Sequence, residues 1–245
     1  MEKFIVVIPA RMESKRLPGK PLIKIGRLPM IIRTYLQCLK VVSRKLIYIA
    51  TDSPKIKKVC NLYGAQCIIT SKKCLTGTDR VAEVSKKIKA KFYINVQGDE
   101  PFFNPTDLKK IILYAKKNPT TIINGYTKID DKKNFERSSI PKLVFDKNHN
   151  LLYMSRAPIP SNKKKKFICG WRQVCAYSFP LKALKFFSKF KKKTFLESLE
   201  DIEILRFVEN DIKVKMIKMT NKSISIDEKK DLIKAKIYLN VKNKK

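Results

Sequence analysis

Short apolar runs recur through the first half of the chain and alternate with segments of helical spacing. Four runs are rich in β-branched or aromatic residues, as is typical of buried strands, and they span 4–8, 46–50, 67–69 and 92–96. Apolar residues recur every three or four positions over 29–42 and 78–89, which predicts helices there. Alternating strands and helices indicate βαβ units and a parallel sheet.

Two further helices are predicted from their first residues. Ser53 and Asn104 are each followed by proline, and a polar cap before a proline is a common helix start.

The pattern changes after about residue 118. Apolar runs at 143–145 and 151–154 flank a polar segment, which predicts a hairpin with His149 in its exposed turn. The remaining predicted elements are strands at 173–179 and 214–217, helices at 181–190 and 196–208, and an exposed basic loop at 161–166.

The charge is unusual, because 55 Lys and Arg residues against 21 Asp and Glu give a net charge of +34. One interpretation is a protein that binds nucleic acid or an anionic membrane. The other is compositional drift, since Lys far outnumbers Arg, and Lys, Ile and Asn share AT-rich codons. The lysines are scattered as pairs rather than gathered in one motif, so we favour the second interpretation and expect no nucleic-acid partner.

The cysteines and apolar runs argue against a zinc protein and against a membrane-spanning protein. No two of the six cysteines have C-x-x-C spacing and there is one histidine, so we expect no zinc site. Free thiols in apolar runs fit a reducing cytoplasm. No apolar run approaches the ~20 residues of a membrane span, so none is expected.

The loop at 9–21 follows the first predicted strand directly. Ligands of open α/β sheets bind beyond the carboxyl ends of the strands. The cations Arg11, Lys15, Arg16 and Lys20 could therefore surround a polyphosphate there, with forked arginine donors and mobile lysines. The alternative, an ordinary basic surface loop, explains the whole run less well. The Walker pattern G-x-x-x-x-G-K-[ST] is absent.

Two more motifs carry candidate chemistry. The segment 95–101, Asn-Val-Gln-Gly-Asp-Glu-Pro, ends the fourth strand, and its Asp99 could bind Mg²⁺, which prefers oxygen ligands and borrows some from phosphates. A simple turn is the alternative. The segment 76–80, Thr-Gly-Thr-Asp-Arg, is either a helix start capped by Thr78 or a place where Arg80 approaches a nucleotide base.

Together these motifs resemble the 3-deoxy-manno-octulosonate (Kdo) cytidylyltransferases, also called CMP-Kdo synthetases. The matching segments follow the family's order along almost the whole chain: Ile8-Pro-Ala-Arg11, Arg16-Leu-Pro-Gly-Lys-Pro-Leu22, Ala50-Thr-Asp52, Thr76–Arg80, Asn95–Pro101, Ser155-Arg156, Ile159-Pro160 and Ile226-Asp227.

The resemblance implies an α/β, Rossmann-like nucleotidyltransferase fold with a mixed, mainly parallel sheet and a small inserted lobe. It implies one cytidylyltransferase domain over 1–245, with a nucleotide-binding part at about 1–120 and 220–245 and a sugar and dimerisation part at about 121–219. It also implies CTP and an acidic sugar as substrates, Mg²⁺ as cofactor and a homodimer.

The resemblance also implies roles for single residues. Arg11 and Lys20 would hold the CTP phosphates, and Asp99 would act with them in catalysis. Asp99 and Asp227 would bind Mg²⁺, although Asp227 is equally a plausible N-cap of a last helix. The residues expected to contact the nucleotide are Ala10, Arg11, Arg16, Lys20, Thr76, Arg80 and Gln97.

The sugar half departs from the family pattern. The expected sugar contacts are Arg156, Gln173, Tyr177 and Glu203. Gln173, Cys175 and Ile204 stand where the family usually has His, Gly and Gln. If those positions contact sugar hydroxyls, we expect a different acceptor sugar, because a site built to hydrogen-bond a hydroxyl discriminates strongly between substrates. If they lie behind the residues that contact the sugar, their side chains can change without changing the acceptor.

The sequence thus predicts transfer of CMP from CTP to Kdo, for lipopolysaccharide or capsule synthesis. One alternative is a cytidylyltransferase for another acidic sugar, such as 8-amino-Kdo. An alternative of another class is a basic nucleic-acid-binding module on a degenerate fold. Asp99 and Asp227 oppose it, since carboxylates without a metal repel phosphate.

Overall fold

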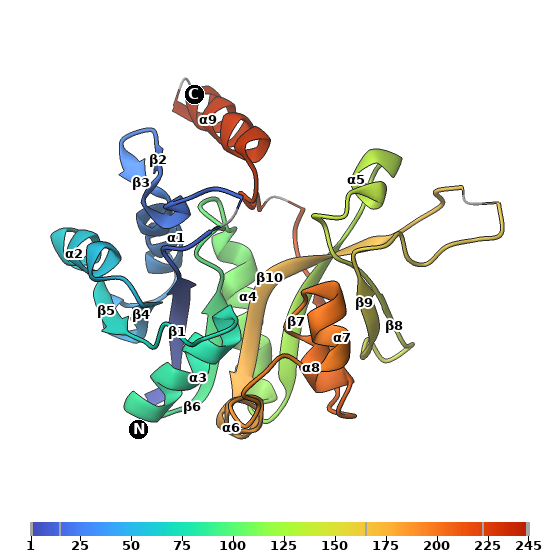
Figure 1. The fold of residues 1–245 in the computed structure, drawn as a ribbon, viewed down its shortest axis with the longest axis horizontal. Helices are drawn as coiled ribbons and strands as arrows, with labels where there is room; N and C mark the ends of the chain where they lie inside the picture. The colour runs from blue at the N-terminus through green and yellow to red at the C-terminus, as the bar shows by residue number, and fades with distance from the viewer. Residues whose placement is uncertain (1, 15, 165, 222, 244–245) are drawn as a thin grey trace.

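A nine-stranded mixed sheet forms the centre of the molecule, and helices cover both of its faces (Figure 1). The computed structural model describes residues 2–14, 16–164, 166–221 and 223–243. Lys15, one of the cations expected in the first loop, lies outside these ranges, as does residue 165 of the expected basic loop.

The sheet confirms the predicted mixed, mainly parallel arrangement. Its order is β11 (Val214–Lys218), β7 (Ile122–Lys128), β10 (Trp171–Pro180), β6 (Ala90–Val96), β1 (Glu2–Ala10), β4 (Ile47–Thr51) and β5 (Gln66–Ile69). Neighbours are parallel except at β10, which is antiparallel to both β6 and β7. The predicted hairpin is β8 (Lys142–Phe145) with β9 (Leu151–Ser155), and β8 pairs with β10. A small hairpin joins β2 (Lys24–Ile25) to β3 (Leu28–Pro29).

Alternate residues of the central strands pack in two hydrophobic cores, one on each face of the sheet. In β1, Val6 and Ile8 pack in the core under α1 (Met30–Leu39), α2 (Pro54–Leu62) and α4 (Pro105–Lys117). Ile5 and Val7 point to the opposite face, as the two-residue period of a strand requires. That face carries α3 (Gly77–Lys87), α6 (Leu181–Phe187), α7 (Phe195–Glu200) and α8 (Leu205–Val208).

Four further helical elements lie among the described residues. They are α5 (Lys132–Glu136), α9 (Lys229–Asn243) and the 3₁₀ turns η1 (Lys20–Leu22) and η2 (Arg44–Leu46). Ala235 of α9 packs with Leu17, Ile25 and Phe102 in a third core near the first loop. Within the described ranges, no helix combines the length and apolar character needed to cross a bilayer.

Strand β7 was absent from the sequence prediction. Its run is interrupted by Asn124 and Gly125, yet Asn124 is fully buried. The Asn124 amide donates to the carbonyls of Val174 (3.1 Å) and Ala176 (3.0 Å) in β10. The β10–β7 register shifts between Val174 and Tyr177, so Asn124 satisfies the carbonyls that this bulge frees.

Two predicted helices differ from the structure. The helix expected over 196–208 is two helices, because Asp201 takes a left-handed conformation (φ 51°) that ends α7. The cap of α3 is Thr76 rather than Thr78. The Thr76 hydroxyl accepts the Asp79 N–H, and the Asp79 carboxylate accepts the Thr76 N–H at 2.8 Å, which forms a capping box.

A buried ion pair joins the helices of the second core. Arg206 and Glu197 are both 0% exposed, and their side chains meet at 2.6 Å and 2.7 Å through two nitrogens and two oxygens. The guanidinium also lies 3.6 Å from the Phe187 ring centroid and 3.4 Å from Asp79. This pair therefore connects α8 and α7 with α6 and α3.

We expect Glu197→Gln to lower the free energy of unfolding by about 3–5 kcal/mol, because it leaves the buried Arg206 with the longer 3.4 Å contact to Asp79 in place of its close counter-charge. Urea unfolding measures this. The matched control is Glu136→Gln, which breaks the exposed Lys132–Glu136 pair and should cost under about 0.5 kcal/mol. Equal stability of the two variants would contradict the importance of the buried pair.

Candidate active site

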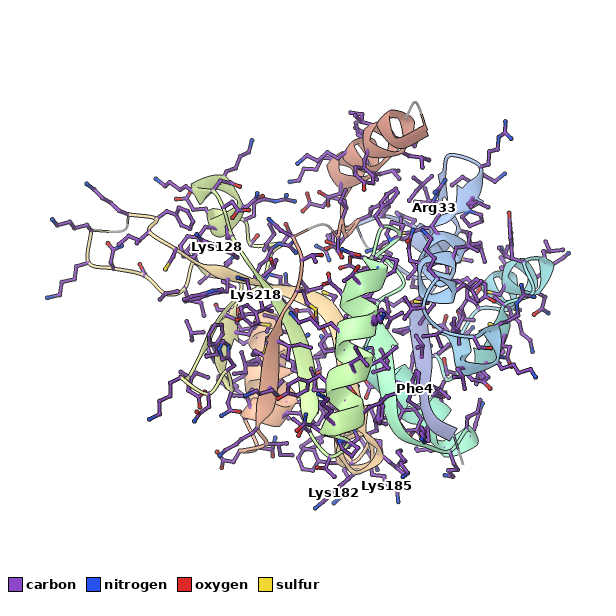
Figure 2. All side chains as sticks on the ribbon, turned by 180° about the vertical axis from the view of Figure 1, so that it is seen from behind. Phe4, Arg33, Lys128, Lys182, Lys185 and Lys218 are labelled. Carbon is purple, nitrogen blue, oxygen red and sulfur yellow. The ribbon has the colours of Figure 1, made fainter. Side chains whose placement is uncertain are left out.

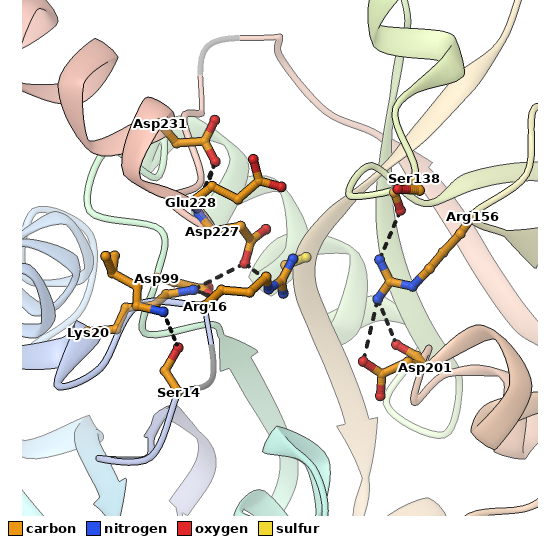
Figure 3. Close-up of polar contacts among 12 residues, drawn as sticks. Ser14, Arg16, Lys20, Asp99, Ser138, Arg156, Asp201, Asp227, Glu228 and Asp231 are labelled. Atoms are coloured by element: carbon orange, nitrogen blue, oxygen red, sulfur yellow. Dashed lines mark hydrogen bonds and ion pairs between the residues drawn. The ribbon is translucent and has the colours of Figure 1, made fainter.

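Three segments meet beyond the carboxyl ends of β1 and β6. Lys20 comes from the loop after β1, Asp99 from the loop after β6, and Asp227 from the segment before α9. The Lys20 ammonium lies 2.7 Å from Asp99 Oδ2 and 3.1 Å from Asp227 Oδ1 (Figure 3). Arg16 Nη2 lies 3.5 Å from the same Asp227 oxygen. The structure thus brings together four of the predicted site residues.

The backbone holds the two carboxylates in place. A Cβ on Gly98 would lie 2.7 Å from the Pro9 carbonyl oxygen, so only glycine allows the β6 loop this close to β1. The Ile226 N–H donates to the Asp99 carbonyl at 3.0 Å, which fixes the segment carrying Asp227 beside it.

The charges around Lys20 favour its protonated form. Burial by itself would lower the pKa of Lys20, but the carboxylates of Asp99 and Asp227 outweigh it and raise that pKa above its usual value. The ammonium balances two carboxylates that would otherwise repel each other.

The same two carboxylates fit a magnesium ion. Their oxygens converge on one cation, and Mg²⁺ is commonly bound by one or two carboxylates with substrate phosphates and water. Across the described part of the chain, no group of three or more His, Cys, Asp or Glu side chains is placed to hold a metal. Phosphate and water oxygens would therefore have to complete such a site.

Gln97 and Glu203 contact each other, although the sequence placed one in the nucleotide half and the other in the sugar half. Gln97 Nε2 donates to Glu203 Oε1 at 3.0 Å, and the Thr78 N–H at the start of α3 donates to Glu203 Oε2 at 3.0 Å. A Cβ on Gly77 would lie 2.8 Å from the Gln97 amide, so this glycine leaves room for it. Burial raises the pKa of Glu203.

Arg80 lies outside the Lys20 cluster. It is 3% exposed, and its guanidinium donates to Asp52 Oδ2 at 2.6 Å and to Thr70 Oγ1 at 2.8 Å. It therefore fastens the start of α3 to the ends of β4 and β5. Asp52, to which the sequence assigned no role, is its counter-ion.

The other nucleotide-half candidates lie around the same rim. Ala10 is buried at the end of β1, Arg11 is exposed directly after it, and Thr76 caps α3. Their contacts with a nucleotide stay predictions.

Arg156 is held mainly by backbone oxygens. Its guanidinium donates to the carbonyls of Glu200 (2.6 Å), Ser138 (3.0 Å) and Asp201 (3.0 Å), and Figure 3 shows it apart from the Lys20 cluster. Its side chain remains 29% exposed. Its expected contact with the sugar stays a prediction.

Gln173 and Tyr177 form a hydrogen-bonded set with Asn124. Gln173 Nε2 donates to Asn124 Oδ1 and to the Tyr177 hydroxyl, both at 3.0 Å, and Tyr177 is 2% exposed. Cys175 lies between them in the sequence, and its Sγ is 4.0 Å from Gln173 Oε1. Burial first, and then Glu100 and Asp99, raise the pKa of its thiol. Their sugar-binding roles stay predictions.

Asp227 does not cap α9, which was the alternative role that the sequence allowed. The helix begins at Lys229, and the Asp227 carboxylate contacts Lys20 and Arg16 instead. The acid that serves the helix start is Asp231, whose carboxylate accepts the Glu228 N–H at 3.1 Å. Asp231 was not among the predicted site residues, although an acid in the first turn of a predicted helix is a visible signal in the sequence.

The chain is similar to known cytidylyltransferases. Residues 5–223 match the family model described as cytidylyltransferase. A protein of Rickettsia massiliae named 3-deoxy-manno-octulosonate cytidylyltransferase is 37% identical over 241 residues, covering 96% of this chain and 95% of its own. A protein of the same name from Chloroherpeton thalassium is 34% identical over 245 residues, covering 97% and 98%.

Solved structures of cytidylyltransferases are also similar to this chain. The structure of CMP:2-keto-3-deoxy-manno-octonic acid synthetase complexed with CTP has a TM-score of 0.89 at 29% identity, covering 98% of this chain and 100% of its own. A cytidylyltransferase from Leptospira borgpetersenii, at 14% identity and a TM-score of 0.62, shares the fold.

The buried carboxyl of Glu100, next to Asp99, should make the free energy of unfolding depend on pH. Glu100 is 4% exposed and its Oε2 has no hydrogen-bond partner among the described residues. Burial, with Asp99 next, raises its pKa from 4.5 to about 8. The folded state thus retains a proton that the unfolded state releases, and the free energy of unfolding falls as the pH rises through this window.

We expect Glu100→Gln to become more stable than the wild type as the pH rises from about 5 to about 8, by at least about 1 kcal/mol. Urea unfolding at both pH values, without Mg²⁺ or CTP, measures the difference. The exposed Glu136→Gln variant controls for the lost charge and should follow the wild-type curve. A pH-independent difference would show that Glu100 ionises normally.

Proposed function

The chain belongs to the 3-deoxy-manno-octulosonate cytidylyltransferase family, and from this premise we infer that it transfers CMP from CTP to Kdo and releases pyrophosphate. The observation that carries the proposal is the convergence of Lys20, Asp99 and Asp227 at the edge of the sheet where β1 and β6 end. Cations beside paired carboxylates suit a metal-bound triphosphate.

We assign the triphosphate to the cations of the first loop. Arg11 and Arg16 are exposed on the rim, and Lys20 lies between the carboxylates on a flexible side chain. Forked guanidinium donors and a mobile ammonium can neutralise the charge of phosphate oxygens. Lys20 balances the two carboxylates in the free protein, and its ammonium can reach toward phosphate once another cation takes its place.

Asp99 and Asp227 would hold Mg²⁺. Bound there, the ion would shield the phosphate charge and lower the pKa of the attacking hydroxyl. The residues supply the rest by position, because phosphoryl transfer depends on alignment and charge neutralisation more than on covalent groups.

The acceptor is assigned to the side of the site formed by β10 and the 200–206 turn. Its anomeric hydroxyl oxygen forms a bond to the α-phosphorus, the bond from that phosphorus to the β-phosphate oxygen breaks, and the hydroxyl proton is lost to solvent. Glu203 joins the acceptor side to the nucleotide side, since its carboxylate accepts a hydrogen bond from Gln97. Arg156, Gln173 and Tyr177 line the same side as proposed sugar residues.

We also propose a homodimer and a cytoplasmic setting. Large apolar side chains are exposed on the inserted lobe: Leu152 (57%), Ile168 (76%), Phe195 (72%) and Leu199 (71%). Exposed apolar side chains of this size are suited to burial against a second copy. All six cysteines are free thiols, which with the need for CTP supports the cytoplasm.

Pyrophosphate release from CTP, measured with a panel of 2-keto-3-deoxy sugar acids, tests the function. We expect turnover with Kdo, dependent on Mg²⁺. Turnover only with another acid, such as 8-amino-Kdo, would show that Gln173 and Cys175 have changed the acceptor. No turnover with any acid, together with salt-sensitive DNA binding, would overturn the enzyme assignment.

We expect Lys20→Met to separate two roles of the ammonium. Without it, Mg²⁺ binding in the absence of nucleotide should tighten, because the carboxylates lose the cation that competes for them. The kcat/KM for CTP should fall by about 10²–10³, as when one electrostatic contact to a reacting group is removed. Calorimetry and the pyrophosphate assay measure the two effects.

The matched control is Lys24→Met, an exposed lysine in β2 that should alter neither quantity. Unchanged or weaker metal binding by Lys20→Met would contradict the competition between Lys20 and the metal.

A further inference from the structure

Asp231 fixes the backbone on which Asp227 stands. Its Oδ2 accepts the N–H groups of Asp227 (3.2 Å) and Glu228 (3.1 Å). The Asp227 carboxylate is thereby left free to face Lys20 and Asp99 rather than the helix. Figure 3 shows the Asp231 carboxylate next to Glu228, joined to its backbone nitrogen by a dashed line.

The second oxygen of Asp231 reaches into the inserted lobe. Arg137 Nη2 lies 3.4 Å from Asp231 Oδ1, and the two side chains are only 21% and 11% exposed. Arg137 follows α5, 94 residues away in the sequence. Its buried Nε has no hydrogen-bond partner within the described ranges, so the contact with Asp231 is the one that orients the guanidinium.

Arg137 is itself fastened to the acceptor side. The fully buried Lys142 ammonium donates to the carbonyls of Arg137 (2.8 Å), Ile140 (2.7 Å) and Arg156 (2.5 Å). Arg156 Nη1 donates in turn to the Ser138 carbonyl at 3.0 Å. The segment 137–142 and Arg156 are therefore joined by several hydrogen bonds.

We propose that Arg137 and Asp231 are positioning residues that couple the acceptor lobe to the metal-binding carboxylate Asp227. Any displacement of Arg156 by an acceptor reaches Arg137 through Lys142, and reaches Asp227 through the ion pair. The proposal rests on the proposed function, because it concerns the metal and acceptor of that reaction.

The test compares variants that break the ion pair in different ways. Arg137→Met and Asp231→Asn remove the contact between lobe and helix, yet the Asn oxygen can still accept the backbone N–H groups. Asp231→Ala removes both. Lys132→Met is the matched control, because it deletes a cation of the same lobe whose partner, Glu136, is exposed.

The measurements are the half-saturating Mg²⁺ concentration in pyrophosphate release and the Mg²⁺-dependent affinity for CTP by calorimetry. Loss of a residue that supports a metal ligand typically costs 10–100-fold in metal affinity. We expect a rise in half-saturating Mg²⁺ of about 3–10-fold for Arg137→Met and Asp231→Asn, and of at least about tenfold for Asp231→Ala. Thermal unfolding checks that each variant is folded.

The double variant Arg137→Met/Asp231→Asn should need no more Mg²⁺ for half-saturation than the more impaired of the two single variants, since both substitutions remove the same contact. If the wild type turns over CTP but Arg137→Met and Asp231→Ala require the same Mg²⁺ as Lys132→Met, the coupling is overturned and the function stands. If the wild type neither turns over CTP nor binds it with Mg²⁺, the proposed function itself fails.

Discussion

The mutual repulsion of two carboxylates at one edge of the sheet is the constraint around which the structure is arranged. Asp99 and Asp227 are 128 positions apart, yet they share the Lys20 ammonium at 2.7 Å and 3.1 Å. That proximity needs β1 beside β6, a glycine at position 98 and a C-terminal segment hydrogen-bonded to the β6 loop. Such an arrangement is suited to the nucleotide and metal site that we propose.

The opposite side of the site depends on buried polar groups that satisfy one another. Arg206 and Glu197 connect four helices, and Asp79 links this pair to the cap of α3. The start of α3 then meets Glu203, which orients the Gln97 amide. Each group is costly when unpaired in a low-dielectric interior, so the network defines one arrangement of α3 against the lobe.

The sequence predicted features whose cause is local or follows from strand ends. Apolar β-branched runs identified β1, β4 and β6, and motifs after their ends brought Lys20 and Asp99 to one edge. It missed β7, whose buried Asn124 is explained by a bulge 50 residues away. It could not predict that Arg156 would be held by carbonyls or that Arg137 would pair with Asp231, because such contacts depend on tertiary placement rather than on periodicity.

The closed hydrogen-bonded set of Asn124, Gln173 and Tyr177 also bears on how this site can evolve. Both hydrogens of the Gln173 amide are used, one on each neighbour. A change at Gln173 alone leaves the buried Asn124 oxygen and the buried Tyr177 hydroxyl without this hydrogen-bond partner. Each unpaired group lowers the free energy of unfolding by about 1–3 kcal/mol. A tolerated change at Gln173 is therefore expected to require a second substitution at Asn124 or Tyr177, whether or not these positions contact the acceptor.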